Sequence, residues 1–271
     1  VVGGTVNVGT SSGNTIGETT GTGSFTVIGG ALRMNVSGIY ITGTGTVDCR
    51  NNNIGSITSA NVNTAFSTNF YGINNTATAG ITTIRGNTIG SASTPNSINS
   101  SSISSASPQS VFGISNTSVI TLTISNNTIA NLNNSSTNIT TTTRGRIAGI
   151  SSTNGTNIVT NNIIHNLSNA NANGASNETA SVCGIGLAGA GFLKTVIGNT
   201  IYNLSNSYTS FTGYVIGLYF AGSTGGNTVS ENFIHSLSAA NGSSAGNLCG
   251  IRIVSGTTTY SNNIISYGGD T

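Results

Sequence analysis

Carboxylates decide whether this chain could cleave polysaccharides. Hydrolysis of a glycosidic bond needs two carboxyl groups flanking that bond, and a calcium site needs several carboxylate or carbonyl oxygens. The sequence has five acidic residues, which lie far apart along the chain: Glu18, Asp48, Glu178, Glu231 and Asp270. We therefore keep a polysaccharide lyase or hydrolase as an alternative and expect that the chain is not an enzyme.

Three cysteines are the next candidates for chemistry. Cys183 and Cys249 each precede a glycine and lie two cycles apart in the repeat described below. Equivalent positions two strands apart are separated by about 9–10 Å, whereas a disulfide needs Cα atoms within about 7 Å. A zinc site would need paired ligands at short spacing, and Cys49 also lacks such a partner. We expect three free thiols packed as small apolar residues, with no metal and no cofactor.

Two histidines fall at the same place in this repeat. His165 and His235 each lie three residues after an Asn marker, and Tyr202 occupies that position in the cycle between them. A column of His, Tyr and His could line a shallow site, but no carboxylate lies beside both histidines. We expect these three residues to form a solvated surface patch.

Charged side chains are scarce, at 4% of residues against about a quarter in typical globular proteins. The net charge is +2 and the basic residues form no run, so nucleic acid is not an expected partner. Asp48, Arg50 and Arg85 are the nearest thing to a charged patch, and we expect a weak surface ion pair there. No segment approaches 18 consecutive apolar residues, so we expect no membrane insertion.

A repeat of about 35 residues organises the whole chain. Its first marker is the pattern Asn-x-Ile-x-x-Leu, whose copies begin at Asn52, Asn87, Asn127, Asn162, Asn199 and Asn232, with partial copies at Asn14 and Asn263. Its second marker is Gly followed by Ile or Leu, at Gly38, Gly72, Gly113, Gly149, Gly184, Gly217 and Gly250. Units of this kind bury their apolar sides only against their neighbours, so residues 1–271 are expected to form one solenoid domain.

The apolar segments within each cycle are too short for helices. In the cycle from Val111 to Leu132 they span three to six residues and are separated by Asn, Ser or Gly, which is typical of strands. Three strands per cycle, each stacked on its equivalents, predict an all-β, right-handed parallel β-helix, or β-solenoid. We expect about 7–8 coils, with residues 1–36 as a degenerate first coil. The chain also ends within the pattern, which indicates a segment of a longer repeat protein.

The Asn marker has a structural explanation. Asn tolerates the left-handed backbone of a tight corner, and stacked Asn side chains can hydrogen-bond along the coil axis. We therefore predict a structural ladder formed by Asn52, Asn87, Asn127, Asn162, Asn199, Asn232 and Asn263. The Gly marker is expected where a neighbouring backbone approaches closely or the strand bends.

Variable segments separate the end of one Asn marker from the next Gly marker. They span residues 58–70, 93–111, 133–147, 168–182, 205–215 and 238–248. All are expected to leave the solenoid at one corner, where insertions often form the binding side. Their few aromatic residues are expected to anchor these loops to the body: Phe66, Phe70, Tyr208 and Phe211.

The coils from Gly38 to Asn263 resemble the Asn/Ser/Thr/Gly-rich right-handed parallel β-helix repeats of long cell-surface adhesins from Bacteroidota-type bacteria, exported by type IX secretion. The resemblance implies an extracellular adhesin or structural filament that makes neutral polar contacts with glycans or with host or abiotic surfaces. Open sheet edges at the two ends would favour self-association. A minor alternative is an ice-binding solenoid, since outward Thr residues recur, for example at Thr83, Thr123 and Thr195.

Overall fold

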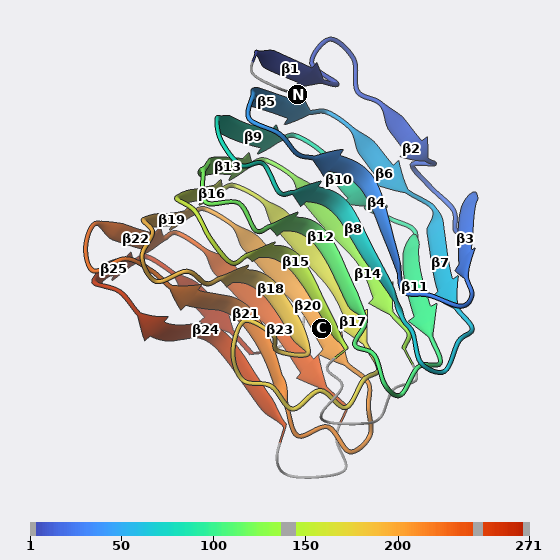
Figure 1. Cartoon of the computed structure of the whole chain (residues 1–271). Helices are drawn as coiled ribbons and strands as arrows, with labels where there is room; N and C mark the ends of the chain where they lie inside the picture. Colours follow the sequence, from blue (N-terminus) through green and yellow to red (C-terminus); the bar gives the residue numbers. More distant parts are fainter. Residues whose placement is uncertain (1–3, 137–144, 241–245, 268–271) are drawn as a thin grey trace.

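Three parallel sheets run the length of the molecule (Figure 1). The structure is a computed structural model and describes residues 4–136, 145–240 and 246–267. Sheet A stacks β1 (Thr5–Val8), β5 (Thr46–Arg50), β9 (Ile81–Arg85), β13 (Thr121–Ser125), β16 (Asn157–Thr160), β19 (Lys194–Ile197), β22 (Asn227–Ser230) and β25 (Thr258–Ser261). Sheet B stacks β2 (Thr15–Gly17), β6 (Asn53–Gly55), β10 (Thr88–Gly90), β14 (Thr128–Asn134), β17 (Ile163–Asn169), β20 (Thr200–Asn206), β23 (Phe233–Ala239) and β26 (Ile264–Ser266). Sheet C stacks β4 (Met34–Ile41), β8 (Thr68–Asn75), β12 (Ser110–Asn116), β15 (Arg146–Ser152), β18 (Val182–Leu187), β21 (Tyr214–Ala221) and β24 (Asn247–Ser255).

Each coil passes through sheet A, then sheet B, then sheet C before the next coil begins on top of it (Figure 1). The register follows the sequence repeat, because Ile89 pairs with Ile129 and Ile129 pairs with Ile164. Within the described residues, sheet C has seven strands and sheet A has eight. The predicted all-β parallel solenoid and its number of coils are therefore confirmed.

The first three coils contain a fourth strand that the prediction of three strands per coil missed. These strands are β3 (Phe25–Gly29), β7 (Ile57–Asn61) and β11 (Ile98–Ser102). They pair in one row, and β11 also pairs with the second half of β14. The second half of β14 is thus the continuation of this row, joined directly to its first half. Residues predicted as the beginnings of variable loops are therefore strands.

The interior is filled mainly by aliphatic side chains, with a few buried polar residues such as Asn157 among them. The position three residues before the ladder Asn points inward, and Cys49, Ile84 and Ile124 there are fully buried. The Gly marker faces this interior. A Cβ atom added at Gly149 would lie 2.5 Å from Cγ2 of Ile164 and 2.7 Å from the carbonyl oxygen of Gly184. Glycine is required here because an isoleucine from sheet B and the neighbouring backbone fill the space of a side chain.

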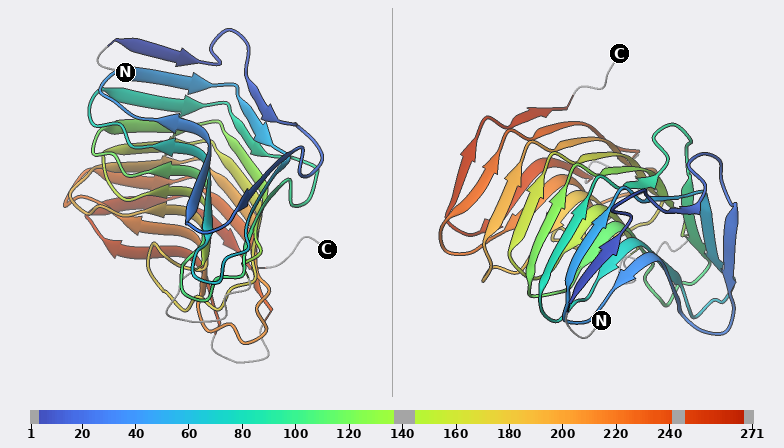
Figure 2. Two further views of the ribbon diagram at one scale, coloured as in Figure 1. Left: turned by 45° about the vertical axis from the view of Figure 1, so that its right-hand side comes forward. Right: turned by 90° about the horizontal axis from the view of Figure 1, so that it is seen from above.

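The connections from sheet B to sheet C emerge on one side of the solenoid, as predicted (Figure 2). Phe211 in one of them is fully buried and belongs to the core, whereas Phe70 is fully buried within β8. Parts of the predicted variable segments 133–147 and 238–248 lie outside the described residues. A second apolar cluster, which includes Phe112, Cys183 and Ile216, covers part of the outer face of sheet C.

Candidate functional site: a polar groove along sheet B

The Asn ladder lies at the corner between sheets A and B, and its members from Asn52 to Asn232 are buried. In its middle, Asn127 Nδ2 donates to Asn162 Oδ1, and Asn162 Nδ2 donates to Asn199 Oδ1, both at 2.9 Å. Each Oδ1 also accepts the backbone N–H of the preceding ladder residue, as Asn162 Oδ1 does from Asn127 at 3.0 Å. The row of side-chain amides extends from Asn14 to Asn263, and these amides hydrogen-bond to one another and to backbone groups. The ladder is therefore structural, as predicted.

The backbone geometry proposed for the ladder residues was wrong. The left-handed residue is the one before the ladder position, as at Asn126 and Asn161, where φ is +54°. Glu231 takes the same conformation before Asn232, and Gly86 does so before Asn87. The corner therefore needs a residue that tolerates positive φ one position earlier, and the ladder Asn is present for its side chain alone.

A second set of left-handed residues bends four consecutive strands of sheet B, from β14 to β23. Asn131, Asn166 and Asn203 have φ between +52° and +58°, and Ser236 has φ of +54°. The bend lies between two inward residues, such as Ile164 and Leu167 on β17. Because successive coils bend at the same place, the outer face of sheet B is hollowed along the solenoid axis.

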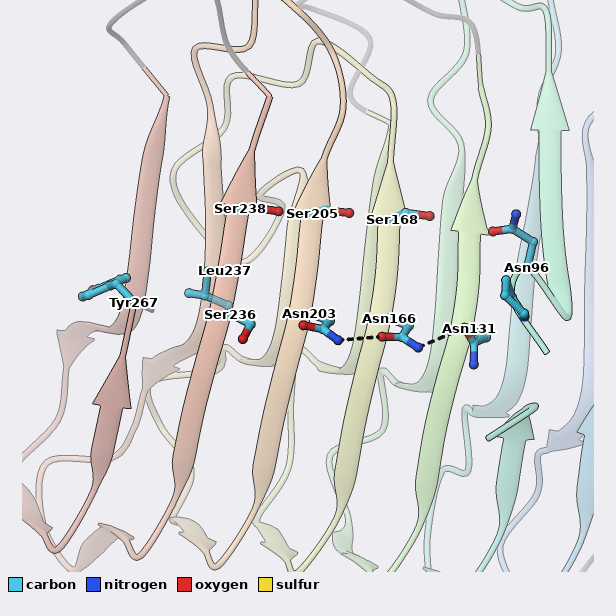
Figure 3. A pocket seen from close by; sticks show the side chains of 11 residues that line it. Asn96, Asn131, Asn166, Ser168, Asn203, Ser205, Ser236, Leu237, Ser238 and Tyr267 are labelled. Atoms are coloured by element: carbon cyan, nitrogen blue, oxygen red, sulfur yellow. Dashed lines mark hydrogen bonds between the residues drawn. The ribbon is translucent and has the colours of Figure 1, made fainter. Parts of the chain in front are cut away.

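This hollow forms a groove with a volume of about 760 Å³. Figure 3 shows one row of Asn131, Asn166 and Asn203 and a second row of Ser168, Ser205 and Ser238 along it. Pro95 and Asn96, from the connection between β10 and β11, line it toward the first coils, and Tyr267 lines it toward the last. Together these residues define the groove.

The groove is lined by neutral hydrogen-bonding groups. Asn203 Nδ2 donates to Asn166 Oδ1 and Asn166 Nδ2 donates to Asn131 Oδ1, both at 3.1 Å. An amide nitrogen has two protons, so Asn166 and Asn203 each keep one donor for a ligand. None of the residues that line the groove is acidic or basic. Such a surface suits a ligand that offers many hydroxyl groups and little charge.

The His–Tyr–His column lies beside the groove, where each ring directly precedes Asn166, Asn203 or Ser236. The rings of His165 and Tyr202 stack at 4.7 Å and those of Tyr202 and His235 at 4.9 Å, with planes within 2°. The expectation that this patch is solvated was wrong for the histidines, which are 7% and 8% exposed. Tyr202 stacks on both of them, and Phe233 also stacks on His235. Burial lowers the pKa of His165, so its imidazole is neutral near pH 7.

The remaining predicted residues are dispersed over the molecule. Cys183 and Cys249 both pair with Ile216 between them and are free thiols, as predicted. Asp48 pairs with Arg50 and, at 3.4 Å, with Arg85 on the outer face of sheet A. The outward Thr column there is interrupted, because Ile158 separates Thr123 from Thr195. Only short runs of outward Thr residues therefore support the ice-binding hypothesis.

The described residues show no metal site and no membrane-spanning helix, and comparisons with known proteins point to no further site. Over the described ranges, no group of three or more His, Cys, Asp or Glu residues could hold a metal ion. No helix in that part of the chain is long and apolar enough to cross a bilayer. Comparisons with protein-family models, with curated proteins and with solved structures give no match. Function is therefore inferred from the geometry of the chain itself.

The groove residues were missed at the sequence level, although a signal for them exists. Asn131, Asn166 and Asn203 each follow a ladder Asn by four residues, and Ser56 and Ser236 occupy the same position. Because Asn and Ser are frequent throughout the sequence, this second periodicity does not stand out. It carries information only once positive φ at these positions is known.

Proposed function

We propose that this chain is an adhesive β-solenoid that holds a neutral glycan lengthwise in the groove of sheet B, outside the bacterial cell. The observation that carries the proposal is the lining of the groove, where amide and hydroxyl groups recur once per coil and no charged side chain is present. Strands in neighbouring coils lie about 4.8 Å apart. A chain of sugar rings would therefore meet a polar group at regular intervals.

The cell-surface location is part of the same proposal. The chain contains only seven Lys and Arg residues, so trypsin-like proteases find few cleavage sites. Long stacked sheets leave little of the backbone open to attack. A surface with so few charges responds weakly to ionic strength. These properties suit a durable filament exposed to a changing medium.

The enzymatic alternative has weaker support. The acids in the described part of the chain are Glu18, Asp48, Glu178 and Glu231. None of them lines the groove, and glycoside hydrolysis needs two carboxyl groups across the scissile bond. We therefore propose binding without turnover.

Removal of the groove amides tests the proposal. Asn166→Gly combined with Asn203→Gly deletes both side chains while keeping a residue that tolerates positive φ. Asn126→Gly combined with Asn161→Gly is the matched control, because these asparagines are also left-handed and exposed but lie at the other corner. Retention would be measured by affinity electrophoresis through gels that contain a panel of neutral polysaccharides.

The groove variant should lose retention by roughly fivefold or more, since two hydrogen bonds of about 0.5–1.5 kcal/mol each are removed. The control should bind like the parent chain, and raising the salt concentration should change neither result. Equal loss in both variants, or no retention by the parent chain, would count against the groove. Release of reducing or unsaturated sugar ends during the assay would favour the enzyme instead.

A further inference from the structure

A second hollow lies on the outer face of sheet C, away from the groove, and two arginines line it. Arg33 precedes β4, and Arg146 is the first residue of β15. Both line a cleft of about 400 Å³, together with Asn69, Tyr71 and Ser110. No more than seven basic residues are spread over the whole sequence, so two of them at one cleft form an unusual concentration of positive charge.

Arg146 is held firmly at this cleft. Its guanidinium lies 4.8 Å from the centre of the Phe112 ring, and its Nε donates to Ser110 Oγ at 3.3 Å. The Phe112 ring in turn packs against Tyr71, with centroids 5.7 Å apart. Stacking and one hydrogen bond fix the plane of the guanidinium, while its Nη groups make no hydrogen bond within the described part of the chain. A planar, pre-oriented guanidinium is well suited to bidentate recognition of an oxyanion.

Arg33 adds a second positive charge near the same phenol. Its Nη2 donates to Ser107 Oγ. Arg33, Tyr71 and Arg146 all line the cleft. Burial raises the pKa of Tyr71, whereas the charges of Arg146 and Arg33 act in the opposite direction. Among the described residues, the only ion pairs join Asp48 to Arg50 and Arg85, so neither cleft arginine is neutralised by one.

Glu178 directly precedes Thr179, which lines the cleft, and it interacts electrostatically with Arg146 and Tyr219. It makes no ion pair with Arg146 within 4 Å. The attraction therefore stops short of a hydrogen-bonded pair. Two cations that share a cleft without a bound partner gain most from a ligand that is itself an anion.

We propose that Arg33 and Arg146 bind the carboxylate or sulfate group of an acidic saccharide, with Tyr71 beside the sugar ring. The observation that favours a saccharide is a neighbouring hollow of about 180 Å³, which shares Tyr71 and Arg146 as its wall. That hollow is lined mainly by neutral polar side chains, such as Asn74, Ser115 and Thr117. A charged position followed by amides and hydroxyls matches a polyhydroxylated ligand that carries an acidic group.

Titration calorimetry on the full chain tests this assignment. The probes are an oligogalacturonate, a sulfated oligosaccharide of the same length, a neutral oligosaccharide and inorganic phosphate. The variants are Arg33→Gln and Arg146→Gln, with Arg146→Lys to keep the charge and remove the planar fork. Arg252→Gln is the matched control, because Arg252 also stacks on an aromatic ring of sheet C, 4.7 Å from the centre of Tyr214, but does not line the cleft.

The parent chain should prefer an acidic oligosaccharide over the neutral one by at least about tenfold, as expected for charge-assisted hydrogen bonds. The oligogalacturonate and the sulfated probe tell which oxyanion is preferred. Arg33→Gln and Arg146→Gln should each remove most of that preference, Arg146→Lys should remove part of it, and Arg252→Gln should leave it within twofold. Arg33 is exposed, so its variant remains informative even if replacement of Arg146 disturbs folding.

Three results would overturn the proposal. An equal loss in Arg252→Gln would mean that overall charge attracts the probe. Phosphate binding as tightly as the oligosaccharides would mean that the cleft does not recognise a sugar. Absence of any preference for acidic probes would remove the site altogether. The groove variant Asn166→Gly, Asn203→Gly should keep the acidic preference, so the two proposals fail separately.

Discussion

Replacement of one ladder asparagine should destabilise the middle of the solenoid strongly. Asn162 Oδ1 accepts two hydrogen bonds from Asn127, at 3.0 Å from its backbone nitrogen and 2.9 Å from its Nδ2. Asn162 Nδ2 donates to the carbonyl of Ile124 at 3.0 Å and to Asn199 Oδ1 at 2.9 Å. Asn162→Ala therefore leaves two buried donors on Asn127 without their acceptor. With about 1–3 kcal/mol for each unsatisfied group, the expected loss is about 3–5 kcal/mol after partial relaxation.

The end of the ladder provides the internal comparison. Asn263 Oδ1 accepts the same two bonds from Asn232, at 3.1 and 2.9 Å, but these bonds are only partly buried. Water can replace a lost acceptor there, so Asn263→Ala should cost about 1 kcal/mol. Coils open locally, hence amide hydrogen exchange resolved by coil is the appropriate measurement, with urea unfolding beside it. Equal costs at the two positions, or a cost below about 1 kcal/mol at Asn162, would refute the ladder as a source of stability.

Three further outcomes are expected from buried and half-buried positions. Gly149→Ala should lower the unfolding free energy by about 1–3 kcal/mol through overpacking, whereas Gly225→Ala, with open space around it, should be nearly neutral in the same urea titration. Lys194 is buried, and burial lowers its pKa from 10.5 to about 8. Between these two pH values the unfolded chain binds more protons at Lys194 than the folded chain does. The free energy of unfolding should therefore rise with pH from about 8 toward 10. Lys194→Met should abolish that rise. Burial raises the pKa of Cys183 to about 12, so its thiol should stay protonated and unreactive at pH 8. Iodoacetamide at that pH should therefore alkylate the half-buried Cys249 first and Cys183 only after unfolding, and mass spectrometry would identify the modified residue.

Positions that are set by the interior could be predicted from the sequence. Ile89, Ile129 and Ile164 recur in phase because each must fill the same space in its own coil. The Gly marker recurs because the Ile of sheet B occupies the place of its side chain, as Ile164 does at Gly149. Where the interior accepts only one kind of side chain, that residue type recurs once per coil in the sequence. This periodicity predicts the number of coils, the register of the strands and the columns of inward residues.

Positions that are determined by backbone conformation show a weaker periodicity of residue type in the sequence. The corner before the ladder accepts Asn126, Gly86 or Glu231, since the requirement is positive φ and not one side chain. The bend of sheet B accepts Asn166 or Ser236 for the same reason. No single residue type marks either place, so the left-handed conformation was assigned to the wrong column and the groove was not predicted.

The arginine cleft was hidden for a different reason. Arg33 and Arg146 lie in different coils, more than three repeats apart in the sequence, and neither falls in a charged run. What brings them together is that Arg33 precedes β4, whereas Arg146 begins β15, on one outer face of sheet C. Charge counting along the sequence cannot show such a pair.

The two candidate sites use the freedom that the solenoid leaves to its surface. The core fixes only inward residues, so the bend at Asn166 and the outer position at Arg146 can vary without loss of the stack. The groove repeats from coil to coil and would bind a long neutral chain weakly at many points. The cleft lies at one place on the outer face of sheet C, where Arg33 and Arg146 both line it, and it would recognise a single acidic group. Under the two proposals together, repeated neutral contacts in the groove would add avidity to one charged contact at the cleft for a ligand long enough to reach both.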